Sequence, residues 1–380
     1  MSDSSAPGTS GSHSPAPKAG GPSSARAPLA VIGSLALIGG IVVVVAGAFA
    51  YTGGFLSPGR ITPTKLVDAL APPGGPALGH RRNHAKGICF TGVFEANGNG
   101  AALSTAPMLA AGRHPAMGRF NLATPDPKAP DATVRVRGLG LEIVADGQTW
   151  RAAMIDPPFF PVATPQAFFD LLTAAHSPAP EAMKDFIAAH PEFATFAGWA
   201  GSAPWTASYA QDQFNSLNAF LFTDASGTAH AVRWSYRPQA AVTPISKDDL
   251  EKLGPDHLEQ EITSRVAQAP QRWTLELTVA NPGDPTNDPS KAWPEGRRTV
   301  DAGTLIVDKI EPEPDGPCRD INFDPTILPA GIAVSDDPFP AARSAAYARS
   351  FNLRTAEWRD YPYQTPAAPP AAATPATPKP

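Results

Sequence analysis

The chain has 380 residues, of which 42% are hydrophobic, so it is long enough to bury one large core or two ordinary ones. Lys and Arg number 30 and Asp and Glu number 35, which gives a formal net charge of −5. A chain with this balance lacks the basic surface that binds a phosphate backbone, which argues against nucleic acid as a partner.

The amino-terminal part contains a polar segment followed by an apolar one. Residues 1–28 are rich in Ser, Gly, Pro and Ala, a composition that predicts a disordered tail. Residues 29–51 carry no charge, and at about 1.5 Å per residue they are long enough to cross a hydrocarbon layer of about 30 Å. The sequence therefore predicts a transmembrane anchor. The alternative is a cleaved signal peptide, because Ala48-Phe49-Ala50 has the small-x-small form of a cleavage site.

The charges that flank this segment are nearly balanced. Lys18 and Arg26 precede it, and Arg60 and Lys65 follow it, so the positive-inside rule decides little. An exported carboxy-terminal domain is the usual consequence of an amino-terminal anchor. We therefore expect a single-pass protein of the cell membrane that contacts lipid through this helix, with its catalytic domain on the periplasmic or extracytoplasmic side.

The remaining chain is expected to form a linker over residues 52–79, one folded domain over residues 80–363 and a disordered Pro- and Ala-rich tail over residues 364–380. Within the domain, apolar residues alternate and tight turns such as Asp146-Gly147 intervene, which predicts antiparallel strands. The expected strands are residues 87–96, 133–143, 149–154, 218–223, 229–236 and 272–279. The expected helices are residues 62–70, 164–170, 181–200 with a break at Pro191, 248–267 and 339–353. The fold class is α+β, an antiparallel β-barrel with surrounding helices.

Two short segments, far apart in the chain, resemble motifs of the same protein family. Residues 81–87 read RRNHAKG, which resembles the distal-histidine strand of haem catalases. Residues 343–347 read RSAAY, which resembles the Arg-x-x-x-Tyr helix that supplies the proximal haem ligand of that family. Four further segments resemble the family's motifs in the same order: Gly118-Arg119-Phe120, Arg137-Gly138, Trp293-Pro294, and Phe323-Asp324-Pro325 with the following Leu328–Ile332. The chain is most similar to the small catalase-related peroxidases.

The resemblance implies a haem b site with defined roles. Tyr347 is expected to bind ferric iron as a phenolate, with Arg343 one helical turn earlier supplying a cation that stabilises the anion. His84 is expected to take a proton from bound peroxide and return it to the leaving oxygen. Three arginines are assigned to the haem propionates: Arg81, Arg119 and Arg354.

Two departures from the family pattern bear on the activity. The position of the distal Asn of catalases falls on Met154, and Asn121 stands where catalases have a Ser. Because the distal Asn helps to hold the second peroxide of dismutation, its loss predicts a peroxidase. It would reduce hydrogen peroxide or organic peroxides with electrons from an organic donor, with low catalase activity. The alternatives are a non-enzymatic haem-binding or peroxide-sensing membrane protein, and a fatty-acid hydroperoxide isomerase or lyase.

Two cysteines, Cys89 and Cys318, are too few for a disulfide framework. They would form one bridge if they were close in an oxidising compartment, which sequence does not show. Because isolated buried thiols are common, we expect free thiols.

Overall fold

A computed structural model describes residues 26–53, 55–56, 59–314 and 316–360 of the protein. The chain divides into two compact units, Met1–Arg60 and Ile61–Pro380. The predicted tails lie outside the described residues, except that residues 26–28 begin the first helix.

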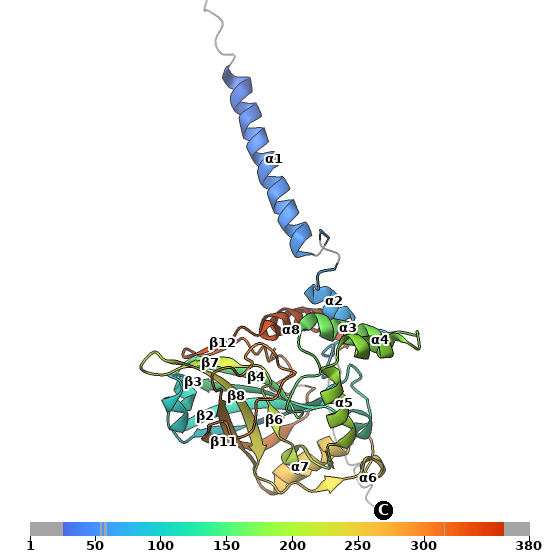
Figure 1. Cartoon of the computed structure of the whole chain (residues 1–380), viewed down its shortest axis with the longest axis vertical. Helices are drawn as coiled ribbons and strands as arrows, with labels where there is room; N and C mark the ends of the chain where they lie inside the picture. Colours follow the sequence, from blue (N-terminus) through green and yellow to red (C-terminus); the bar gives the residue numbers. More distant parts are fainter. Residues whose placement is uncertain (1–25, 54, 57–58, 315, 361–380) are drawn as a thin grey trace, which may run out of the picture. The chain divides into compact units, whose positions relative to one another are not determined.

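The first unit contains one continuous helix, α1, from Arg26 to Thr52 (Figure 1). Its segment Ile32–Thr52 is apolar and long enough to cross a membrane. The predicted anchor at residues 29–51 falls within this helix. Its length and composition fit a membrane span, and they also fit a signal sequence.

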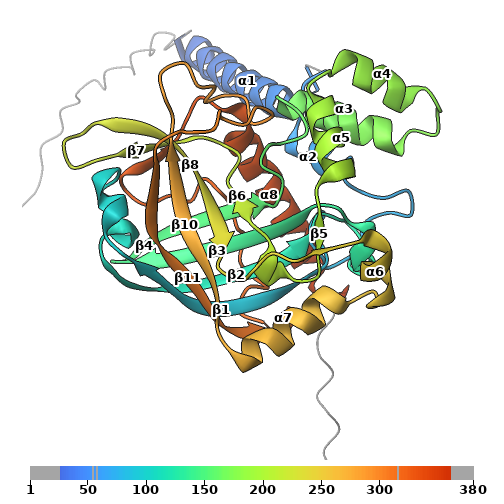
Figure 2. The same cartoon turned by 60° about the horizontal axis from the view of Figure 1, so that its bottom comes forward.

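The second unit is built on an eight-stranded antiparallel barrel (Figure 2), which confirms the predicted fold. Around the barrel the order is β10-β11-β1-β2-β3-β4-β6-β8, and β8 closes it by pairing with β10. The strands are β1 Gly87–Ala96, β2 Gly112–Leu122, β3 Arg137–Ala145, β4 Gln148–Ile155, β6 Phe214–Asn215, β8 Ala229–Pro238, β10 Gln271–Val279 and β11 Thr299–Glu311. Two strands, β7 (Phe220–Thr223) and β12 (Ile332–Val334), extend the sheet beyond β8.

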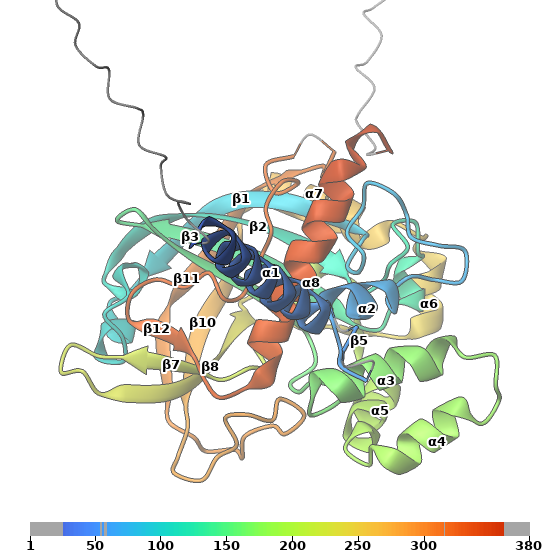
Figure 3. The same ribbon diagram turned by 90° about the horizontal axis from the view of Figure 1, so that it is seen from above.

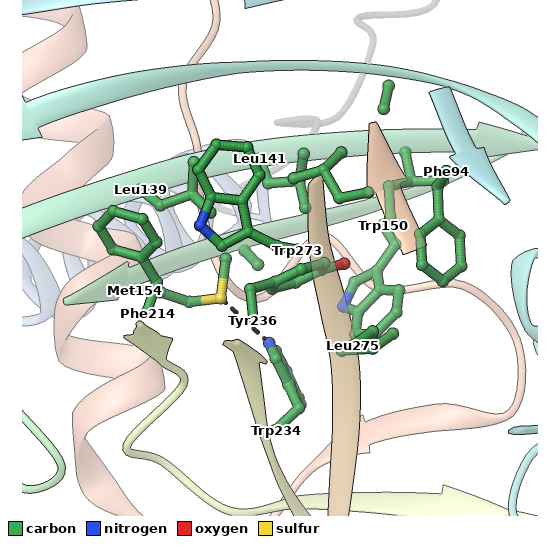
Figure 4. Close-up of a cluster of buried hydrophobic side chains, with 14 of the residues drawn as sticks. Phe94, Leu139, Leu141, Trp150, Met154, Phe214, Trp234, Tyr236, Trp273 and Leu275 are labelled. Atoms are coloured by element: carbon green, nitrogen blue, oxygen red, sulfur yellow. Dashed lines mark hydrogen bonds between the residues drawn. The ribbon is translucent and has the colours of Figure 1, made fainter. Parts of the chain in front are cut away.

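Alternation along the strands sorts side chains between the barrel interior and its outer face. The interior is filled by large aromatic and aliphatic side chains (Figure 4), and burial of each stabilises the fold by about 1.5–3 kcal/mol. Phe120 of β2, for example, packs on Tyr209, Phe214 and Trp273. The residues on either side of Phe120, namely Arg119 and Asn121, therefore point to the outer face.

Helices cover the outside of the barrel. In Figure 1, α8 and α3 lie above the barrel, whereas α6 and α7 lie below it; Figure 3 shows α8 passing across its top. Two of these helices begin at residues that suit a helix start: Thr164 and Asp337 accept hydrogen bonds from the backbone of α3 and α8, and a proline follows each. The helices are α2 Pro63–Asp68, α3 Pro165–His176, α4 Ala182–Ala189, α5 Phe193–Ser202, α6 Lys247–Lys252, α7 His257–Gln268 and α8 Pro338–Ala356.

Some expected elements differ from the structure. The helix expected over residues 248–267 is two helices, α6 and α7, because Gly254 takes a positive φ of 105° and Pro255 follows it. The strand expected from residue 133 starts only at Arg137, because residues 134–136 leave the sheet and line a cavity. The domain boundaries stay predictions, although Leu66 and Val67 of α2 pack in one cluster with Ala346 of α8.

Cys89 and Cys318 form a disulfide, so the expectation of free thiols was wrong. The two residues are 229 apart in sequence. Cys89 lies on the outer face of β1, and the segment after β11 packs against that face. Only the tertiary fold brings the two residues together.

We expect the double substitution Cys89→Ala/Cys318→Ala to lower the free energy of unfolding by about 2–5 kcal/mol, because the bridge closes a long loop of the unfolded chain. Chemical denaturation of the oxidised wild type and the variant measures this difference. Equal stability would show that the bridge contributes nothing.

Candidate active site

A cavity of about 630 Å³ lies between strands β2–β4 and helix α8. Its size is in the usual range for cofactor pockets, roughly 300–1,000 Å³. The walls combine apolar side chains from several helices with a small number of polar groups. All six residues predicted for the site line this cavity: Arg81, His84, Arg119, Arg343, Tyr347 and Arg354.

His84 is held in an unusual backbone conformation at the start of β1. Its φ is 55°, in the left-handed region that non-glycine residues seldom adopt. Two interactions hold this conformation. The His84 backbone N–H donates to Asn83 Oδ1 at 2.9 Å, and the His84 carbonyl accepts from Arg119 Nη1 at 2.7 Å. Such strain is typical of functional positions, where surrounding contacts fix a residue that local preference would release.

The imidazole of His84 is kept neutral. Burial is the main reason, and it lowers the pKa of His84 to about 4. The hydrogen bond with Asn121 raises the pKa, whereas the positive charges of Arg119, Arg343 and Arg81 lower it further. A neutral imidazole can accept a proton, as the predicted role requires.

The rate of the peroxide reaction should therefore hold from neutral pH down to about 5 and fall as the pH approaches 4, because only neutral His84 accepts a proton. Rapid-mixing rates in buffers across this range measure the profile. Loss of half the rate near pH 6.5, the ordinary value for histidine, would contradict the described environment.

Tyr347 and Arg343 lie one turn apart on α8. Arg343 Nη2 donates to the Tyr347 hydroxyl oxygen at 3.1 Å and to the Ala153 carbonyl at 2.7 Å. Its Nη1 donates to Asn218 Oδ1 at 2.7 Å, and Asn218 Nδ2 donates to Asp337 Oδ2 at 2.8 Å. Sequence reasoning missed Asn218 and Asp337. Asp337 is readable as a helix cap before a proline, but no local signal marks Asn218.

A buried carboxylate, that of Glu313, lies among the cavity arginines. It accepts from Arg119 Nη2 at 2.5 Å and forms an ion pair with Arg81. Burial raises the pKa of Glu313, but Arg119 and Arg81 outweigh that effect and hold it below its usual value. Arg81 Nη2 also donates to the carbonyls of Cys318 and Ile321 at 3.1 Å. No local motif marks Glu313, which follows β11, so sequence reasoning missed it as well.

Comparison with known proteins identifies the family. The family model described as "Catalase" matches residues 62–373. The chain belongs to the catalase family. It is 33% identical over 311 residues to a catalase-related peroxidase of Synechococcus elongatus, covering 80% of this chain and 91% of the relative. A catalase-related peroxidase of Mycolicibacterium paratuberculosis is 32% identical over 307 residues, with 78% and 96% coverage.

Longer catalases are more distant. Catalase isozyme 2 of Hordeum vulgare is 25% identical over 293 residues, which cover 71% of this chain and 59% of the relative. A crystal structure of a fungal catalase aligns with a TM-score of 0.65 at 18% identity, covering 72% of this chain and 59% of its own. This likeness shows the fold. The relatives of similar length show that this member of the catalase family is a peroxidase, and the family implies a haem cofactor.

The residues present fit a haem. The cavity offers a tyrosine that could ligate iron and arginines that could pair with carboxylates. Its apolar walls, which include Phe160 and Phe168, suit a porphyrin ring. Phe323 also lines the cavity, and its ring packs so closely on Gly140 of β3 that a Cβ there would lie 2.8 Å from it. Among the described residues, no group of three or more His, Cys, Asp or Glu forms a metal site. In a bound haem, Tyr347 could ligate the iron, and Arg81, Arg119 and Arg354 could face the propionates.

Met154, the residue at the expected position of the distal Asn of catalases, lines the cavity but carries no amide. Its sulfur accepts from Trp234 Nε1 at 3.3 Å within the barrel core (Figure 4). Its neighbours Ala153 and Ile155 alternate to the outer face of β4, and neither carries an amide. The amide that contacts His84 comes from β2: Asn121 Oδ1 lies 2.6 Å from His84 Nδ1.

Proposed function

We propose that this protein is a peroxidase with haem b that reduces hydrogen peroxide or organic peroxides with electrons from an organic donor, and that it has low catalase activity. The proposal is carried by the convergence of His84 and the Arg343–Tyr347 pair on one cavity. The supporting chemistry is a proton acceptor, a phenol beside a cation, and apolar walls.

The proposed mechanism assigns a task to each residue. Bound haem supplies a redox-active iron for the two-electron reduction of peroxide. Tyr347 would ligate that iron, and Arg343 would favour its phenolate form. His84 takes the proton of the attacking peroxide oxygen at Nε2 and delivers it to the departing oxygen as that oxygen leaves as water or an alcohol.

The donor reaction should be far faster than oxygen evolution, because the β4 residues that line the cavity, Ala153, Met154 and Ile155, have no amide to hold a second peroxide. Oxygen-electrode rates and rates of aromatic-donor oxidation, measured on one preparation, test this. Oxygen evolution as fast as donor oxidation would overturn the low-catalase part of the proposal. A rearranged fatty-acid hydroperoxide as the main product, formed without any donor, would favour an isomerase or lyase.

We also infer that α1 anchors the protein in the cell membrane once, with residues 80–363 on the oxidising, extracytoplasmic side. Two observations support this: α1 contains an uncharged segment of spanning length, and the second unit has a buried disulfide of the kind found in oxidising compartments. Protease treatment of intact cells tests the orientation. A domain that stays protected would overturn it, and a mature amino terminus after residue 50 would favour the signal peptide.

Deleting residues 29–51 should give a soluble protein that retains haem, because every site residue lies in the second unit. Haem absorbance of the soluble fraction measures the outcome. A folded but haem-free product would show that the boundary is wrong.

A further inference from the structure

The amide of Asn121 has only one orientation compatible with its neighbours. Its Nδ2 donates to the Arg119 carbonyl at 3.2 Å, and a carbonyl oxygen can only accept. Oδ1 must then face His84 Nδ1, 2.6 Å away. Since Oδ1 is also an acceptor only, the proton of neutral His84 sits on Nδ1, which leaves the lone pair on Nε2.

Space for this amide comes from the neighbouring strand. Asn121 of β2 pairs with Gly138 of β3. A Cβ at position 138 would lie 2.4 Å from Asn121 Oδ1 and 3.1 Å from its Cγ, so a side chain there would displace the amide. Asn121 is buried, and Nδ2 is already bonded to the backbone, so the amide has no other position that keeps both contacts.

We propose that Asn121 is a positioning residue that locks His84 in the tautomer with the proton on Nδ1, and that the missing side chain of Gly138 is required for this lock. The inference rests on the proposed peroxidase function and deepens it. In the proton transfer, His84 gains one proton at Nε2 from peroxide and loses it to the departing oxygen. The Nδ1 proton stays in its bond to Asn121 throughout, so no net proton is consumed by the pair.

The charged groups around His84 do not provide an alternative lock. Arg119, Arg343 and Arg81 act on it from β2, α8 and the preceding segment, and all three are cations that only donate. None of them can accept the Nδ1 proton. The Asn121 carbonyl is therefore the group on which the tautomer depends.

A variant series on the full-length chain tests the proposal. His84 is followed by nitrogen-15 NMR of labelled histidine in protein prepared without haem, and the rate of the peroxide reaction is followed in haem-loaded protein across pH. We expect wild type to show a single tautomer. Gly138→Ala should mix the tautomers and slow the reaction by about tenfold, the change in rate expected from the loss of one buried hydrogen bond. Gly140→Ala is the matched control: it lies on the same face of β3 but would meet Phe323, so the tautomer of His84 should not change.

Further variants distinguish loss of the Asn121–His84 hydrogen bond from a general disruption of the fold. Asn121→Leu keeps the size but removes the acceptor, and it should lose the tautomer preference as Gly138→Ala does. Adding Asn121→Ser to Gly138→Ala removes the amide atoms that the added methyl group would strike, so it should recover much of the lost rate, a non-additive result. An unchanged tautomer in Asn121→Leu, or equal loss in the single Gly138→Ala and the double variant, would overturn the proposal. Because the NMR readout needs no turnover, the expected tautomers in a protein without peroxidase activity would support the lock and reject the proposed function.

Discussion

Replacing Tyr347 with Phe is expected to abolish haem retention or weaken it greatly. Phe keeps the ring and its packing on α8 but removes the oxygen that would ligate iron. It also removes the acceptor of the Arg343 hydrogen bond at 3.1 Å. The half-buried Arg343 guanidinium keeps its bonds to Asn218 and to the Ala153 carbonyl, so the fold should survive. The haem-to-protein absorbance ratio after purification measures the loss.

Tyr209→Phe provides the control for this substitution. Tyr209 is buried in the barrel core, where it stacks on Phe120, and it is not a cavity residue. That variant should keep its haem and its spectrum. Normal haem content with an unchanged spectrum in Tyr347→Phe would eliminate Tyr347 as the axial ligand.

His84→Ala is expected to keep haem and its tyrosine ligand while peroxidase turnover falls by roughly 10²–10⁴-fold, the usual weight of a general acid–base group. That loss corresponds to about 2.7–5.4 kcal/mol of transition-state stabilisation. The proton would have to travel through water instead, since the side chains that neighbour His84, Asn121 and Arg119, cannot accept and return a proton.

His230→Ala is the matched control, because this histidine pairs with Asp224 in a hairpin away from the cavity. Its turnover should equal that of wild type. The two variants are compared at neutral pH with one aromatic donor and with haem content normalised. If His84→Ala turns over at the wild-type rate, another residue moves the proton.

Local motifs in the sequence identified residues that the fold brings together. His84, Tyr347 and the four arginines were named from two short segments and the strands near them, and all line one cavity. Features that depend on contacts between distant segments were missed. Glu313, Asn218 and the Cys89–Cys318 bridge have no local signature, because each acquires its partner only when the barrel closes.

The surroundings of Met154 depend on the fold in the same way. Alternation along β4 turns Trp150, Ala152 and Met154 toward the barrel interior, where the Met154 sulfur meets Trp234. A motif comparison does not show that contact.

The contacts of Asn218 fix the helical register of α8. This single residue, on the loop between β6 and β7, bonds α8 at two points: its starting cap, Asp337, and Arg343 six residues on. A residue inserted between these points would turn everything beyond it by about 100° and advance it by about 1.5 Å. Arg343 would then face away from Asn218, and Tyr347 would leave the cavity with it. The number of residues between Asp337 and Arg343 therefore determines where the Tyr347 phenol lies. The loop between β6 and β7 fixes that number, because Asn218 must reach both residues at once.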